Sequence, residues 1–339
     1  MSPETGTVEN LCLPNYRSTV RTMSAVTGEL DPATLPFDFA TVQRSILTLR
    51  ARIPQDALTA PVLGTERSGF GVVIDTGLVL TIGYLVADAS DVWLIDEGQR
   101  AVPAHVLAYD PETGFALVQA LGPLGLESIP LGCSAELVVG DPVVVAGAGD
   151  AHNAVAAEVI AKHEFAGYWE YVLDEAIFTA PAHPNWGGTA VLGVDGRLYG
   201  IGSLGVQTTN GVSESQSANM IVPIDLLVPI LGELRTHGHT RIPARPWLGW
   251  FVQDQESVLT VIGLYDRGPA ADAGLQAGDR IVEIDGQPAR GLAHLFRVIW
   301  SLGPAGVAVP VTYLRDRQTH TAEITSVDRT ALARTGAVH

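Results

Sequence analysis

The chain has 339 residues, of which 47% are hydrophobic, and a formal net charge of −17. This length can form two domains with separate cores, and the hydrophobic fraction argues against a disordered chain. Nucleic acids and anionic membranes require clustered Lys and Arg, and the sequence contains no such run. We therefore expect neither nucleic-acid binding nor membrane insertion.

The first 40 residues predict a compartment and an arm. Residues 1–10 hold no basic segment and are followed by no apolar stretch of signal-peptide length, so a cytoplasmic location is expected, or a periplasmic one if a leader was removed. Residues 1–40 contain four prolines and no sustained period, which predicts an extended or partly ordered N-terminal arm. The only cysteines are Cys12 and Cys133, for which we expect two thiols, with one disulfide as the alternative.

Short β-type runs follow one another from Ser45 onward, separated by Gly, Pro and Asp. This spacing predicts an all-β barrel rather than βαβ units. The expected strands cover residues 46–53, 69–75, 78–82, 92–95, 102–109, 115–120, 143–146, 172–179, 189–192 and 198–201. Residues 223–234 have apolar side chains at helical spacing behind a proline and predict one amphipathic helix.

Glycine and two prolines interrupt the pattern at residues 237–246, where we expect a domain boundary. Beyond it, the sequence predicts a short helix capped at Gly274, a glycine turn at Gly278, a strand, and a hairpin turn at Asp285-Gly286. A second helix is predicted from an apolar stripe: Leu292, Leu295, Phe296, Ile299 and Leu302.

Two segments resemble the HtrA/Deg family of trypsin-like serine proteases. Residues 183–201, which read His-Pro-Asn-Trp-Gly-Gly followed by two apolar strands, are similar to the segment around the catalytic serine of that family, and residues 246–288 resemble its PDZ domain. The resemblance implies a mainly β fold, in which a trypsin-like double six-stranded β-barrel is followed by an α+β PDZ domain. The implied limits are 1–40 for the arm, 41–240 for the trypsin-like domain, 245–328 for the PDZ domain and 329–339 for a C-terminal tail.

The resemblance also implies that the groups needed for peptide cleavage are replaced. Such cleavage uses a serine, a histidine base, an orienting carboxylate and N–H donors for the oxyanion. The four matching positions hold Trp186 for the serine, Tyr84 for the histidine, Gly114 for the aspartate, and Pro184, which has no N–H, at an oxyanion position. The sequence thus predicts a degenerate catalytic site, a pseudoprotease.

A shift of the alignment by a few residues does not restore the site, because no histidine precedes His105 and no serine lies between Ser134 and Ser203. We therefore expect a non-catalytic protein that binds peptides or protein C-termini as a scaffold, a regulator or a chaperone-like factor. The alternative is an active HtrA-like hydrolase with a rebuilt site, whose nucleophile is one of three residues: Thr189, Tyr84 or Cys133.

The expected peptide site lies in the PDZ domain. The resemblance places the carboxylate-binding loop at residues 248–251, and an extended peptide would lie between the following strand and the second helix by strand addition. The expected binding residues are Leu248, Gly249, Trp250, Phe251, Leu295, Phe296 and Ile299. In this family an N-terminal segment with aromatic residues packs subunits into trimers. In this chain Phe37 and Phe39 are the candidates for such contacts, and the alternative is that they anchor the arm on their own domain.

Residues 162–171 are rich in aromatic side chains and match the region of the family's regulatory loop. We expect Trp169, Tyr171 and Trp186 to fill the former catalytic pocket, either closing it or lining a ligand groove.

No cofactor or metal is expected. His163 and His183 lie in no local ligand triplet, and we interpret His183 as a loop residue that packs beside the cleft. The glycines of residues 143–149 lack the following helix that a dinucleotide-binding loop requires.

Overall fold

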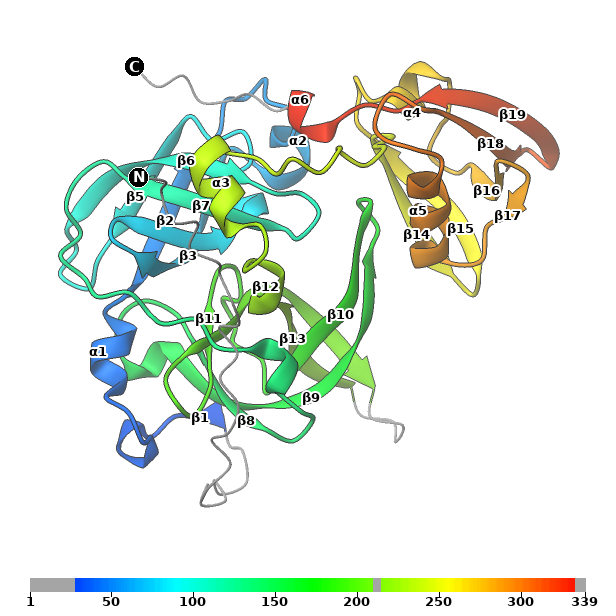
Figure 1. Ribbon diagram of the computed structural model, residues 1–339. Coiled ribbons are helices and arrows are strands. Elements are labelled where there is room, and N and C mark those ends of the chain that lie inside the picture. Colours follow the sequence, from blue (N-terminus) through cyan, green and yellow to red (C-terminus); the bar gives the residue numbers. More distant parts are fainter. Residues whose placement is uncertain (1–27, 210–214, 333–339) are drawn as a thin grey trace, which may run out of the picture.

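Residues 28–209 and 215–332 are described by a computed structural model, which contains two β-barrels followed by a smaller domain (Figure 1). Six strands close the first barrel in the order β2-β3-β4-β7-β6-β5. Their bounds are β2 Ile46–Arg52, β3 Glu66–Asp75, β4 Leu78–Ile82, β5 Asp91–Ile95, β6 Ala101–Tyr109 and β7 Phe115–Ala120. Apolar side chains that point inward from these strands fill the barrel, and those of Leu47, Val79 and Leu117 are fully buried.

Six strands also close the second barrel, because β11 pairs with both β12 and β8. The ring order is β8-β9-β10-β13-β12-β11, and β1 (Gly28–Glu29) extends it beside β9. The bounds are β8 Pro142–Ala146, β9 Ala154–Gly167, β10 Tyr171–Ala180, β11 Ala190–Leu192, β12 Leu198–Thr209 and β13 Ser215–Pro223. The predicted double barrel is confirmed, although the sequence pattern did not predict β9 and β13.

The glycine-containing segment at residues 143–149 includes most of β8 and continues toward β9, which pairs antiparallel with β8. It is therefore a hairpin connection and not a strand-to-helix nucleotide loop.

The single helix predicted at residues 223–234 is wrong. The structure has a 3-10 turn, η5 (Ile224–Leu226), and then a separate helix, α3 (Leu231–His237). Pro229 lies between them and has no N–H to donate to the carbonyl four residues earlier, so it interrupts a continuous helix. The spacing of the apolar residues is satisfied by two short elements that pack on the barrels.

The third domain contains a sheet in the order β14-β15-β16-β18-β19, with β17 beside β16. Its elements are β14 Trp250–Gln255, β15 Val258–Leu264, α4 Pro269–Asp272, β16 Arg280–Ile284, β17 Gln287–Pro288, α5 Leu292–Ser301, β18 Ala308–Arg315 and β19 Gln318–Thr325. Asp285 and Gly286 both have positive φ, of 49° and 71°, as the predicted hairpin turn requires. A last short helix, α6 (Arg329–Leu332), lies within the predicted tail and returns toward the first barrel (Figure 1).

The described part of the N-terminal arm packs on its own domain. Phe39, in α1 (Phe39–Gln43), is buried in the barrel core, and Phe37 packs against the same core and lies over Gly196. These two rings therefore anchor the arm. The remaining short helical elements are η1 Pro32–Thr34, α2 Ala60–Leu63, η2 Gly83–Leu85, η3 Ser134–Glu136 and η4 Ala151–Asn153.

Candidate functional site

The turn at residues 186–189 lies where the two barrels meet. The Phe70 N–H of β3 donates to the Gly187 carbonyl at 2.9 Å, and the Gly188 N–H donates to the Gly202 carbonyl of β12, also at 2.9 Å. The hydroxyl of Thr189 donates to the Trp186 carbonyl at 3.0 Å. Because its backbone is bonded to both barrels, the turn is held rigidly in the cleft between them.

Tyr84 reaches into this cleft from η2. Its hydroxyl donates to the Ser203 carbonyl at 2.8 Å and lies beside Gly187, where an added Cβ would approach it to 2.7 Å. Burial raises the pKa of Tyr84 well above its usual value, and a hydrogen bond with the Trp186 indole lowers it only in part. A buried phenol that already donates its proton is a poor general base.

Tyr171 fills the space next to Gly114. A Cβ added at Gly114 would lie 3.0 Å from the Tyr171 hydroxyl, and Gly114 has φ +82°. The same hydroxyl donates to the Thr113 carbonyl at 2.7 Å. Asp110, the aspartate retained in this segment, accepts from both the N–H and the hydroxyl of Thr113. In this chain the tyrosine occupies the place where an orienting carboxylate would project.

His183 is held by hydrogen bonds on both ring nitrogens and is 1% exposed. Its Nδ1 accepts the Asn185 N–H at 3.1 Å, so in the neutral ring Nε2 carries the proton and donates to the Asn153 carbonyl, also at 3.1 Å. Burial lowers the pKa of His183 below its ordinary value. The ring therefore has a packing role, as predicted from the sequence, and neither nitrogen is free to accept a substrate proton.

The backbone beside the turn offers few oxyanion donors. Pro184 has no N–H, the His183 N–H donates to the Asn219 side chain at 2.6 Å, and the Asn185 N–H is bound by the His183 ring. The N–H donors of His183 and Asn185, on the approach to Trp186, are thus already bonded, one to β13 and one within the loop.

Of the three aromatic residues expected to fill the old pocket together, Tyr171 and Trp186 lie at the degenerate site, whereas Trp169 lies behind Tyr171, which corrects the expectation for Trp169. The Trp186 indole lies against Gly205 and is 39% exposed. Tyr171 fills the Gly114 site, and Trp169 stacks on Tyr171 with ring centroids 5.7 Å apart. Trp169 also packs against the cluster of Trp247, Phe251 and Tyr265 at the edge of the third domain.

Cys133 is disulfide-bonded, which corrects the expectation of two thiols and removes Cys133 as a candidate nucleophile. The other cysteine, Cys12, lies outside the described residues. Within the residues that the structure describes, no three His, Cys, Asp or Glu side chains converge as a metal-ligand set. In the same residues, no helix has the length and apolar character needed to cross a bilayer.

The backbone of residues 248–250 forms an anion-binding loop, and a carboxylate from the second barrel occupies it. Glu170 Oε2 accepts the Leu248 N–H at 2.9 Å, and Oε1 accepts the Gly249 N–H, also at 2.9 Å. Oε1 has longer contacts with the N–H groups of Leu248, 3.2 Å, and Trp250, 3.4 Å. Gly249 has φ +74°, which allows these successive N–H groups to converge on one anion.

Burial raises the pKa of Glu170 to about 7, while the N–H groups of residues 248–250 and the Arg329 guanidinium act in the opposite direction. Sequence reasoning did not identify this residue. Its unusual conformation is visible only in the structure, where Glu170 lies in the tight β9–β10 turn at φ +62°, a conformation that favours Gly or Asn.

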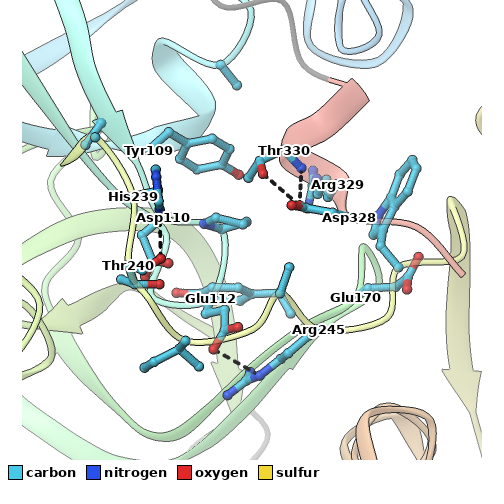
Figure 2. A pocket seen from close by; sticks show the side chains of 18 of the residues that line it. Tyr109, Asp110, Glu112, Glu170, His239, Thr240, Arg245, Asp328, Arg329 and Thr330 are labelled. Carbon is cyan, nitrogen blue, oxygen red and sulfur yellow. Dashed lines mark hydrogen bonds and ion pairs between the residues drawn. The ribbon is translucent and has the colours of Figure 1, made fainter. Parts of the chain in front are cut away.

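A pocket of about 690 Å³ lies beside this contact, between the first barrel, the linker and the third domain. Figure 2 shows Glu112 and Arg245 paired in the pocket, with Glu170 at one side. Arg245 Nε lies 3.1 Å from Glu112 Oε2, and the guanidinium lies 4.2 Å from the centroid of the Trp300 ring. The linker thus connects the first barrel to α5.

The family comparisons agree with this architecture. The profile of the trypsin-like peptidase domain matches residues 69–201, and that of the PDZ domain matches residues 246–325. The chain is therefore a protein with a trypsin-like peptidase fold followed by a PDZ domain. It is also similar in sequence to proteins named DegP-like serine endoproteases.

Relatives include a probable periplasmic serine endoprotease, DegP-like, of Pseudomonas putida, 28% identical over 276 residues that cover 76% of this chain and 55% of the relative. Serine protease PepD of Mycobacterium tuberculosis is 27% identical over 228 residues, 63% of this chain and 48% of PepD. The chain spans about half the length of the curated relatives it matches. Among solved structures, the HtrA-type protease AlgW with a decapeptide gives a TM-score of 0.49 at 22% identity, covering 86% of this chain and 97% of AlgW.

Proposed function

We propose that this protein is a non-catalytic, peptide-binding member of the HtrA-type family, a pseudoprotease whose PDZ domain takes protein or peptide C-termini. The observation that carries the proposal is the content of the cleft. Tyr84 is bonded to the Ser203 carbonyl, Tyr171 fills the space beside Gly114, and an indole projects from the nucleophile turn. None of these groups supplies a hydroxyl nucleophile with a base in reach.

The alternative nucleophiles have little support. The Thr189 hydroxyl is buried and donates to the Trp186 carbonyl within its own turn. The phenol of Tyr84 has a raised pKa, and Cys133 has no thiol. A rebuilt hydrolase site would have to disrupt these contacts first. We infer that the barrels serve as a scaffold for the PDZ domain and its ligand.

The PDZ domain supports the binding half of the proposal. Its loop at residues 248–250 directs N–H groups toward a carboxylate, the group that a peptide C-terminus presents. Leu295, Phe296 and Ile299 are fully buried in a cluster that also includes Val172 of β10, so their contact with a peptide stays a prediction. Phe37 and Phe39 pack against the core of their own domain. Trimer formation through these residues stays a prediction.

We infer an extracytoplasmic location, in place of the cytoplasmic one expected from the sequence. Disulfides persist in oxidising compartments, and Cys133 is disulfide-bonded. The DegP-like relatives are named periplasmic, which agrees with this assignment.

A peptidase assay tests the catalytic half of the proposal. We expect purified protein to give no turnover of casein or fluorogenic peptides and no labelling by a fluorophosphonate, because loss of a linked nucleophile and base lowers kcat by about 10⁶-fold. Turnover that survives Trp186→Ala but is lost in Thr189→Ala would reverse the proposal in favour of a rebuilt hydrolase. Trp186→Ala is the matched control, since it opens the cleft without touching the Thr189 hydroxyl.

A further inference from the structure

The hairpin of β9 and β10 rises from the second barrel and ends against the PDZ domain (Figure 1). Its tip, residues 168–170, makes the contacts expected of a peptide in that domain. The Val252 N–H of β14 donates to the Tyr168 carbonyl at 2.9 Å, which is a strand-addition bond, and the Glu170 carboxylate fills the anion loop.

Side chains of the hairpin complete the contact. Val172 and Ala166 pack with the apolar cluster of the PDZ domain, and the Tyr168 ring lies 5.9 Å from that of Phe251. On the opposite side of the groove, Arg297 of α5 pairs with Glu164 and with Asp174, one from each strand of the hairpin. The hairpin is therefore held by α5 and by β14, the two elements between which a PDZ ligand is expected to lie.

We propose that the tip of the β9–β10 hairpin is an intramolecular ligand of the PDZ groove, in which the Glu170 carboxylate takes the place of a peptide's terminal carboxylate and keeps external C-termini out. The inference rests on the proposed peptide-binding function and adds its regulation. An external peptide can bind the loop at residues 248–250 only when the hairpin has left it. The apparent affinity for the peptide is therefore the intrinsic affinity multiplied by the fraction of molecules with an open groove. The covalent tether favours the internal ligand at ordinary peptide concentrations.

The relative strengths of the contacts identify the residue to change. The ion pairs of Arg297 are exposed, with 45% of the Arg297 side chain and 90% of the Asp174 side chain accessible to solvent, and exposed pairs contribute little. The bonds of Glu170 are buried, so breaking them would leave buried N–H groups without partners, and they are the stronger set. Glu170→Gly removes the carboxylate and also suits the positive φ of the turn, so hairpin strain cannot explain its effect.

Hydrogen–deuterium exchange on the full chain tests the docking without any peptide. We expect the amides of residues 248–252 to be protected in wild type. In Glu170→Gly the same amides should exchange at least about tenfold faster, because the loss of buried hydrogen bonds shifts the equilibrium toward the open groove. Glu175→Gln is the matched control, because Glu175 pairs with Lys162 at 2.9 Å within the same hairpin. Equal protection in wild type and Glu170→Gly would overturn the inference.

Peptide binding then separates the inference from the proposed function. The probe is a fluorescein-labelled ten-residue peptide that ends in valine with a free carboxylate, with its amidated form as the control. We expect Glu170→Gly to bind the free-carboxylate peptide about 10–100-fold more tightly than wild type. Tighter binding supports the inference, and equal affinity overturns it. Faster exchange in Glu170→Gly without binding to any variant would support the internal ligand but remove C-terminal peptides as the function.

The docking also has a predicted pH dependence. Burial raises the pKa of Glu170 from 4.5 to about 7, in a setting that also contains the Arg329 guanidinium and the Tyr265 phenol. Because the docked carboxyl binds its proton more tightly than the undocked one, docking is strongest below pH ~4.5 and weakens as the pH rises through 7. We expect the peptide affinity of wild type to rise about tenfold or more between about pH 5 and 8, and that of Glu170→Gly to stay constant. A flat wild-type profile would contradict this role of Glu170.

Discussion

Replacing Gly188 with alanine is expected to lower the free energy of unfolding by about 3–5 kcal/mol. Gly188 has φ +81°, and an added Cβ would lie 2.0 Å from the Phe70 carbonyl oxygen, an overlap that requires the backbone to move. The Gly188 N–H also holds β12 through the Gly202 carbonyl. Urea denaturation followed by tryptophan fluorescence measures the change.

Gly140→Ala is the control for backbone strain. Gly140 has φ +95° and no atom within 4 Å of the added Cβ, so we expect only about 1–2 kcal/mol there. Equal losses at the two positions would mean that the turn at residues 186–189 does not pack as described. A larger loss of stability at Gly188 than at Gly140 would show that the glycine is needed for packing of the turn after Trp186. That structural role does not depend on a nucleophile at position 186.

Gly114→Asp reintroduces the residue type that the family's catalytic site uses, and it is expected to destabilise the protein by about 3 kcal/mol without producing peptidase activity. The aspartate must adopt φ +82°, and its Cβ meets the Tyr171 hydroxyl at 3.0 Å. The new charge would also lie near the buried carboxylate of Asp110. Urea denaturation and a fluorogenic-peptide assay measure the two outcomes.

Gly125→Asp is the control that separates the effect of crowding by Tyr171 from the effect of a positive φ. Gly125 is exposed, has φ +70° and has no atom within 4 Å of an added Cβ, so the same change there is expected to cost about 1–2 kcal/mol. If Gly114→Asp costs no more than Gly125→Asp, Tyr171 does not fill the site. If Gly114→Asp gains peptidase activity, the proposal of a non-catalytic protein is wrong.

Local sequence patterns were sufficient to predict most of the fold. Strands β4 and β7 have the predicted bounds, and the Asp285-Gly286 turn has the predicted backbone conformation. Both depend on properties of neighbouring residues, namely apolar runs of strand length and residues that tolerate positive φ. The strand β9 was missed, because its outer half, toward residue 167, is a polar and aromatic hairpin rather than an apolar strand.

The residue types in the cleft were also readable from the chain, but their contacts were not. Indole, phenol, glycine and proline at four positions already indicate a site without the usual catalytic groups. That Tyr171 fills the space beside Gly114, and that Trp186 lies on Gly205, depends on strands brought together by barrel closure. Periodicity describes which face of a strand is buried and says nothing about the partner on that face.

By itself, the sequence determined the two domain types and most strands, and it predicts that the residues needed for peptide cleavage are replaced. Only the tertiary structure decided that the anion loop at residues 248–250 already holds a carboxylate. Glu170 and Leu248 are 78 positions apart, and each looks ordinary in its own segment. The physical reason is that buried hydrogen bonds join groups by proximity in space, which the folded arrangement of both domains creates and no local pattern contains.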